Sequence, residues 1–261
     1  MKKYFAIFQT NLLNSLVYPA EVLARSAMIL VFMWIFFQLW QVVFTASGSA
    51  SINGLTLHDT IWYLLLAETL ELGRPRLARV ISDQVKDGSI AYLINKPYNF
   101  LLYQLFSGLG ESLPRMGMLF LIGGALVWAM AGPPPAISNW PAALVALAGA
   151  WLLHFCVNAL IGLAAFVSEE VAPYEWIYQK LVFILGGMLV PLDFYPPWLQ
   201  AVARFLPFAY MMYGPARLFV EPSLQIFSQI IAGQLVWLAV LGGMLALAFS
   251  RGMRRLAING G

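Results

Sequence analysis

Long runs of apolar residues, separated by short polar segments, constrain this chain more than any other feature of its sequence. Hydrophobic residues make up 61% of the chain and charged residues only 10%, whereas soluble domains carry about 25% charged residues. A run of about 20 apolar residues matches the thickness of the hydrocarbon core of a bilayer. Most of the chain is therefore solvated by lipid, and an ordinary water-soluble domain is excluded.

Six apolar runs predict six transmembrane helices. They cover approximately residues 26–45, 60–72, 113–131, 142–167, 176–192 and 226–249. The second run is the least regular, because Glu68 and Glu71 interrupt it. It crosses the membrane only if it continues through Arg74 to Arg79, or if other helices shield it. The predicted fold class is all-α integral membrane, with residues 1–261 in a single transmembrane domain.

The N-terminal segment, residues 1–20, predicts an amphipathic helix that lies on the membrane surface. Phe5 and Phe8 fall on one helical face, and Asn14 lies largely opposite. This pattern is typical of interfacial helices. Pro19 marks the expected end of the helix.

A second unusual segment, residues 193–222, precedes the last span. It is rich in proline and aromatic residues but too apolar for an ordinary loop. We expect short re-entrant helices that dip into the membrane interface. Their aromatic residues and one proline form either an outer gate or interfacial anchors: Phe205, Pro207, Phe208, Tyr210 and Tyr213.

Residues 81–97 form a polar, charged island in this apolar chain. The pattern predicts a short amphipathic helix that is broken near Gly88 and ended by Pro97. Its apolar side would consist of Ile81, Val85, Tyr92 and Leu93. Two interpretations fit this pattern: a helix that docks on a soluble partner, and a solvated loop that has no partner.

The distribution of Lys and Arg predicts the orientation of the chain. With both termini inside, 13 of the 15 basic residues lie in inner segments, and only Arg204 and Arg217 lie outside. The positive-inside rule favours this arrangement. It places residues 81–97 in the cytoplasm and residues 193–222 outside. The net charge of +3 gives no indication of a nucleic-acid partner.

Several motifs, in their order and placement, resemble those of ABC-2 type transporter permeases. The segment Lys86-Asp-Gly-Ser-Ile-Ala-Tyr-Leu-Ile-Asn-Lys-Pro97 resembles the R-x-G-x-[IL]-x-x-x-L-x-[KR]-P-like pattern after the second span of that family. The match is inexact at its first basic residue, which is Lys86. Residues 187–192, 194–199, 206–210 and 213–216 look like the family's fifth span and outer re-entrant helices. The resemblance covers essentially the whole chain and is closest to small bacterial six-span permease subunits that carry no ATPase domain.

This resemblance implies a permease subunit of an ATP-driven exporter in the bacterial inner membrane, with both termini cytoplasmic. Such a subunit moves a hydrophobic or amphipathic substrate outward by alternating access. The implied partners are two copies of an ABC ATPase subunit, a second permease that is identical or homologous, and membrane lipid. By the same resemblance, the residues of a cytoplasmic coupling helix would be Asp83, Lys86, Asp87, Gly88, Tyr92, Leu93, Lys96 and Pro97.

The chain itself is not expected to be an enzyme or to hold a cofactor. It contains no G-x-x-x-x-G-K-[ST] phosphate loop, so ATP and Mg are expected on the partner ATPase. It has neither a G-x-S-x-G nor an H-E-x-x-H motif, and His58 and His154 are its only histidines. No metal site is therefore expected. The remaining alternatives are an ATP-independent secondary transporter, which usually shows internal repeats, and a membrane scaffold.

Two carboxylates lie inside the second apolar run. Glu68 and Glu71 are one helical turn apart, and an unpaired carboxylate is costly at membrane depth. They either contact a cationic substrate or lock a conformation, or they pair with Arg74 or Arg76. The pairing is favoured, because the basic residues are so close.

His154 and Asn158 are the other polar pair within a span. Their spacing of four residues places them on one helical face. They either line a pathway or hold helices together, and the second role is favoured.

Overall fold

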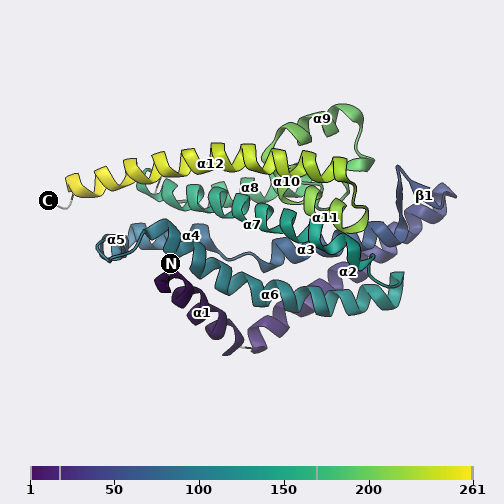
Figure 1. Cartoon of the computed structure of the whole chain (residues 1–261), viewed down its shortest axis with the longest axis horizontal. Coiled ribbons are helices and arrows are strands. Elements are labelled where there is room, and N and C mark those ends of the chain that lie inside the picture. The colour runs from purple at the N-terminus through teal and green to yellow at the C-terminus, as the bar shows by residue number, and fades with distance from the viewer. Residues whose placement is uncertain (1, 18, 169, 260–261) are drawn as a thin grey trace.

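The structure is a computed structural model, and it describes residues 2–17, 19–168 and 170–259. Within 19–26 and 255–259 only the backbone is described, so the side chains of Arg25 and Arg255, both expected inside, lie outside the described part. The protein is an elongated bundle of helices (Figure 1).

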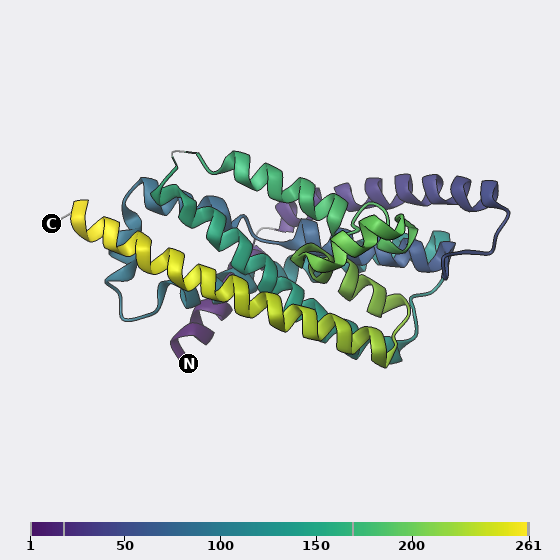
Figure 2. The same cartoon turned by 90° about the horizontal axis from the view of Figure 1, so that it is seen from above.

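The long helices lie roughly along the bundle axis, and consecutive ones run in opposite directions (Figures 1 and 2). They are α2 (Pro19–Ser47), α3 (Leu57–Gly73), α6 (Phe100–Ala131), α7 (Trp140–Leu163), α8 (Ala172–Leu185) and α12 (Leu224–Asn259). Among the described residues, four segments are long and apolar enough to cross a membrane: Ala27–Ser47, Phe100–Ala131, Ile137–Phe166 and Leu224–Arg254. The predicted second and fifth spans correspond to the shorter helices α3 and α8.

Shorter elements close the two ends of the bundle. One end, here called the loop end, holds α4 (Leu77–Lys86), α5 (Ser89–Ile94) and the end of α12 (Figure 1). The other, the hairpin end, holds the antiparallel strands β1 (Ser51–Ile52) and β2 (Leu55–Thr56). The remaining elements are α1 (Lys2–Val17), η1 (Ile137–Asn139), η2 (Ala164–Phe166), η3 (Leu192–Phe194), α9 (Pro197–Phe205), α10 (Pro207–Met211) and α11 (Tyr213–Val220).

The two-residue hairpin was not expected in the loop after the first span. Asn53 and Gly54 connect its strands with φ angles of 50° and 86°. This left-handed pair is the conformation that the tightest hairpin turns require. Directly after the hairpin, Thr56 caps α3, because its side chain accepts a hydrogen bond from the backbone N–H of Asp59.

The sequence left two possibilities for α3: either it continues through Arg79, or other helices shield it. The helix ends at Gly73. Arg74 already has an extended backbone, since the residue before a proline avoids the helical conformation. The predicted continuation of this helix through Arg79 is therefore wrong. The structure agrees with the second possibility, shielding by other helices: α3 packs between α2, α6 and α11, and the side chains from Thr60 to Leu70 are buried.

The ends of the other long helices also differ from the prediction, most of all those of α2, α6, α8 and α12: α2 begins at Pro19 rather than 26. Helix α6 begins at Phe100 rather than 113, because the Asn99 side chain caps it by accepting the N–H of Leu102 at 3.1 Å. Helix α12 is continuous from Leu224 to Asn259 rather than from 226 to 249. Helix α8 begins at Ala172 and ends at Leu185 instead of extending from 176 to 192. Gly187, with φ 70°, turns the chain there.

The N-terminal helix forms as predicted and ends ahead of Pro19, where α2 begins. It packs along α6, and its approach depends on Gly110: a Cβ at that position would lie 2.5 Å from the backbone oxygen of Phe8. The hydroxyl of Tyr4 accepts a hydrogen bond from the N–H of Asn99 at 2.9 Å. Helix α1 is thereby attached to the start of α6.

The helices α4 and α7 also meet at a glycine. A Cβ added to Gly162 of α7 would lie 2.7 Å from Cβ of Ile81 and 2.9 Å from the backbone oxygen of Ala78. Both contacts are shorter than real Cβ atoms show. The tight contact between α4 and α7 therefore excludes any side chain larger than hydrogen at this position.

We expect Gly162→Ala to lower the stability of the protein by about 1–3 kcal/mol, the usual cost of overpacking. The control is Gly242→Ala in α12, where an added Cβ meets no atom within 4 Å. Unfolding is followed on heating by the reaction of a fluorogenic maleimide with Cys156, the only cysteine, which is buried. Equal midpoints for the two variants would contradict the close packing of α4 on α7.

Candidate functional site

The segment formed by residues 77–97, here called the α4–α5 segment, follows the break at Pro75. The apolar face of α4 includes Leu77, Ala78 and Ile81, which are buried against α7. The expectation that Ile81 belongs to a surface offered to a partner is therefore wrong, because Ile81 packs on Gly162. The α4 helix fixes the segment to the bundle.

Gly88 breaks the segment where the sequence predicted. Its φ angle of 76° is in the left-handed region that glycine adopts without strain. Beside it, the Asp87 carboxylate accepts a hydrogen bond from the N–H of Ser89 at 2.8 Å. The hydrogen bonds from Ser89 lower the pKa of the Asp87 carboxyl, so Asp87 is ionised at neutral pH. The turn therefore presents a fixed negative charge.

The predicted coupling residues lie at the surface of the loop end. Asp83, Lys86, Asp87, Gly88, Tyr92 and Pro97 are exposed, and Leu93 and Lys96 are half-buried. Ile90 is fully buried and anchors α5. Tyr92, two residues further along, is 66% exposed, and Lys96 Nζ lies 4.4 Å from the centre of its ring. Helix α5 thus carries an exposed aromatic ring with a cation against it.

Two ion pairs connect the α4–α5 segment to the beginning of α8. Lys86 Nζ lies 3.2 Å from a carboxylate oxygen of Glu170, and Arg79 Nε lies 3.2 Å from Glu175. Exposed pairs of this kind contribute little stability. They orient the segment relative to α8 but do not fix it in place.

A buried polar network lies next to the break between α3 and α4. It consists of Glu71, Arg74, His154 and Tyr178. Glu71 forms an ion pair with Arg74, whose guanidinium lies 5.4 Å from the ring centre of Tyr178. The Tyr178 hydroxyl and His154 Nδ1 are hydrogen-bonded. The network joins the end of α3 to α7 and α8.

The buried polar network also touches α10. Tyr178 Oη lies 3.7 Å from the sulfur of Met211, and its ring centre lies 6.3 Å from that of Phe208. The short helix α10 therefore reaches into the bundle as far as the polar network. Of the predicted gate residues, Phe208 is the one that meets the network.

The carboxylates of α3 behave differently from each other. Glu71 pairs with Arg74, as the favoured interpretation expects, whereas Glu68 is 2% exposed and lies outside that pair. On α7, Asn158 Nδ2 donates to the backbone oxygen of His154 at 2.8 Å. His154 links two helices and Asn158 bonds within its own helix.

The other predicted gate residues are spread over the re-entrant region. Phe205 is 78% exposed, and Pro207 is buried. The Tyr210 hydroxyl donates to the backbone oxygen of Arg204 at 2.8 Å, and the Tyr213 hydroxyl donates to Asp193 at 3.0 Å. These five residues do not form one cluster.

Sequence reasoning missed several residues that organise these sites, namely Tyr178, Asp193, Arg217, and Gln234, whose amide donates to the backbone oxygens of Ala146 and Tyr210. Arg217 forms ion pairs with Asp193 at 3.5 Å and with Glu221 at 2.6 Å. Its charge within the apolar residues 214–220 was a signal that could have identified it. Tyr178 carries no such signal, because a tyrosine near the start of a span is usually an interfacial anchor.

The fold and the sites define the class of protein. Long apolar helices, a buried polar network and a polar segment at one end make the chain a multi-pass membrane protein. Residues 28–260 match the model of the family described as ABC-2 family transporter protein. The chain belongs to this family and is the membrane component of an ABC transporter, in which ATP is hydrolysed on a separate subunit. No curated protein matches the chain.

The buried polar network yields a prediction on Tyr178. We expect Tyr178→Phe to lower the unfolding free energy by about 1–3 kcal/mol, because the buried His154 Nδ1 loses its partner. The change in the midpoint temperature of unfolding is measured by following the reaction of the maleimide with Cys156 on heating.

The control for this prediction is Tyr174→Phe, at a half-exposed position of the same helix. This control is expected to change the midpoint little. If both variants have the same unfolding midpoint as the unmodified protein, the His154–Tyr178 hydrogen bond does not stabilise the bundle.

Proposed function

We propose that this chain is the permease subunit of an ATP-driven exporter in a bacterial inner membrane, with six spans and both termini cytoplasmic. The alternating directions of α2, α3, α6, α7, α8 and α12 support six crossings (Figure 1). With 17 residues, α3 is at the lower limit for a span. It is enclosed by other helices, so it does not need to meet lipid along its length. The loop end is then cytoplasmic, and the hairpin end is outside.

The observation that carries this proposal is the exposed ring of Tyr92 on a helix anchored by Ile90. An aromatic side chain that is held in place but left exposed is suited to insertion into a partner. We infer that the α4–α5 segment is the coupling helix and sits in a cleft of the ABC ATPase. Two copies of this ATPase bind ATP and Mg. A second permease, identical or homologous, completes the transporter.

The position of the buried polar network supports a route from the motor to the pathway. Movement of the α4–α5 segment acts on Arg74, which neighbours the break that joins this segment to α3. Arg74 faces Tyr178, and Tyr178 touches Met211 of the re-entrant helix α10. A rigid-body shift of the segment would therefore change the environment of α10 and switch access from the inside to the outside.

The substrate we propose is hydrophobic or amphipathic. The bundle interior is apolar apart from a few buried polar groups. In this proposal Glu68, Glu71, His154 and Asn158 border the pathway on the loop side, and Phe208 and Tyr213 border it on the outer side. Helix α1, attached to the start of α6, lies at the inner membrane surface.

Binding of the motor is tested by affinity purification of the tagged chain from its native host in mild detergent. We expect an ATPase with a phosphate-loop sequence to co-purify. Tyr92→Ala should reduce its recovery by roughly tenfold, which corresponds to a loss of about 1.4 kcal/mol. Trp198→Ala is the matched control, because Trp198 is 68% exposed on α9, which lies in the half of the bundle away from α5 (Figure 1).

Two outcomes would contradict the coupling role. Recovery of no ATPase under several extraction conditions would favour an ATP-independent transporter or a scaffold. Equal loss of the ATPase with Tyr92→Ala and Trp198→Ala would show that the partner does not recognise the α4–α5 segment.

The orientation is tested with single cysteines in a Cys156→Ala background. We expect Ala91→Cys in α5 to react with a membrane-impermeant maleimide only when the inner face is accessible. Ser51→Cys in the hairpin should react from the outside of intact cells. Both positions are exposed in the isolated chain, and the labelling uses the chain expressed without its ATPase, so a failure to react reports the side and not burial. Labelling of both from the same side would overturn the predicted topology.

A further inference from the structure

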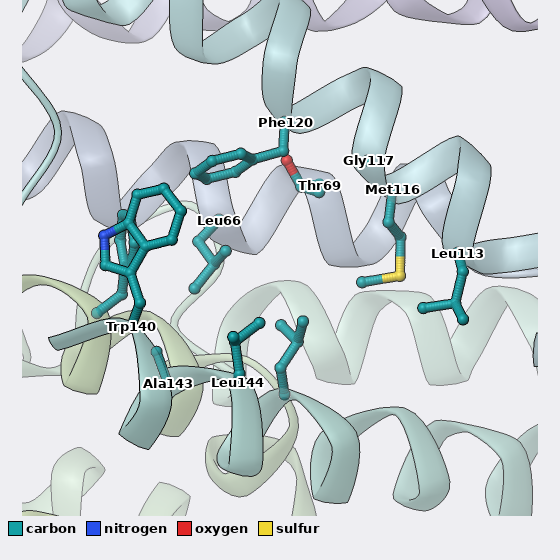
Figure 3. A pocket seen from close by; sticks show the side chains of 11 residues that line it. Leu66, Thr69, Leu113, Met116, Gly117, Phe120, Trp140, Ala143 and Leu144 are labelled. Carbon is teal, nitrogen blue, oxygen red and sulfur yellow. The ribbon is translucent and has the colours of Figure 1, made fainter. Parts of the chain in front are cut away.

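A cavity of about 260 Å³ lies between α3, α6, α7 and α11. Figure 3 shows side chains of α6 and α7 on opposite sides of this cavity, with Leu66 and Thr69 of α3 among its lining residues. The lining also includes Leu113, Met116 and Gly117 of α6, Trp140 and Leu144 of α7, and Phe219 of α11. This cavity, here called the α6–α7 groove, is separate from the buried polar network.

The α6–α7 groove opens sideways, on the perimeter of the bundle. Leu113 and Leu144, at its mouth, are 48% and 59% exposed. Met116 and Phe219, in its floor, are 6% and 3% exposed. Since the chain spans a membrane, a lateral opening between two spanning helices faces the acyl chains of the bilayer.

Water is a poor occupant for this groove. Among its lining side chains, Thr69 and Trp140 carry the polar atoms, and the indole N–H of Trp140 donates to the backbone oxygen of Pro135 at 3.2 Å. The hydroxyl of Thr69 is buried and has no partner in the described part of the chain. A buried water typically makes about three hydrogen bonds, and a single free hydroxyl cannot supply them.

We propose that the α6–α7 groove is a binding site for one acyl chain of a membrane lipid. Transfer of hydrocarbon from lipid to an apolar groove gains no hydrophobic free energy, so packing is what favours it. An empty groove would leave its walls without van der Waals partners. A cavity of about 150 Å³ holds benzene, so this groove accommodates about ten carbons of a chain on the same scale.

Gly117 provides a way to fill the groove without disturbing the bundle. A Cβ built on this glycine meets no atom within 4 Å, and the residue lines the groove. Gly117→Leu therefore places a branched side chain in space that is otherwise open. Gly243→Leu on α12 is the matched control, because its Cβ is equally unobstructed and does not face the groove.

The experiment uses the full chain, reconstituted in phosphatidylcholine vesicles that contain a small fraction of phosphatidylcholine with a diazirine in the middle of one acyl chain. After illumination, the labelled residues are identified by mass spectrometry. We expect labels on Met116 and Phe219, which lipid at the outer surface of the bundle does not reach. Gly117→Leu should reduce these labels by roughly tenfold, a loss of about 1.4 kcal/mol in binding free energy, since its side chain would occupy the space of the acyl chain. Gly243→Leu should leave them unchanged.

Two results would overturn the proposal. In the first, Met116 and Phe219 carry no label: label on the exposed Leu113 and Leu144 alone shows that lipid reaches the mouth without entering the groove, and absence of label on all four shows that a second copy of the chain or another protein surface covers it. In the second, Gly117→Leu folds and keeps the labels on both buried residues. The heating assay with Cys156 shows whether this variant folds; if it does not, the pattern in the unmodified protein decides alone.

Discussion

The enclosure of α3 is the constraint on which the rest of this structure depends. A helix with Glu68 and Glu71 in its last turns cannot face lipid without a large cost. In the bundle, α2, α6 and α11 surround α3, and Arg74 lies beside Glu71. Because α3 is enclosed, it can be short: it ends before Pro75, next to the polar network and inside the protein. The α4–α5 segment begins at that point, so the position of the proposed coupling region follows from the burial of α3.

Much of the architecture could be predicted from the sequence, because lipid requires long apolar runs and leaves polar residues at their ends. The helical bundle, the N-terminal helix, the break at Gly88 and the short helices of residues 193–222 all follow from such local signals. The ends of helices were less accessible. Asn99 begins α6 well before its apolar run because a cap depends on a side-chain hydrogen bond, and Gly187 ends α8 inside an apolar run.

The candidate sites show the same division. The exposure of Asp83, Lys86 and Asp87 could be predicted from their charge. Which apolar residues of α4 and α5 are buried and which are exposed could not be predicted. Ile81 and Tyr92 look alike in the pattern, but one is fully buried against α7 and the other is 66% exposed. Likewise, His154 and Asn158 share a helical face, yet His154 alone reaches a neighbouring helix through Tyr178. Partners that are distant in sequence decide these roles, and local periodicity carries no information about them.

The seat of α10 on α12 has a consequence for how a pathway can open. Gly233 leaves a notch in α12, and the ring of Tyr210 fills it: a Cβ there would lie 2.1 Å from Cε1 of that ring. The adjacent Gln234 donates to the backbone oxygen of Tyr210 at 3.0 Å. Helices α10 and α12 are thereby joined by a ring packed against a glycine and by a side-chain hydrogen bond. In the proposed transport cycle, a passage beside α10 would therefore open more readily between α10 and α8, where Met211 meets Tyr178, than between α10 and α12.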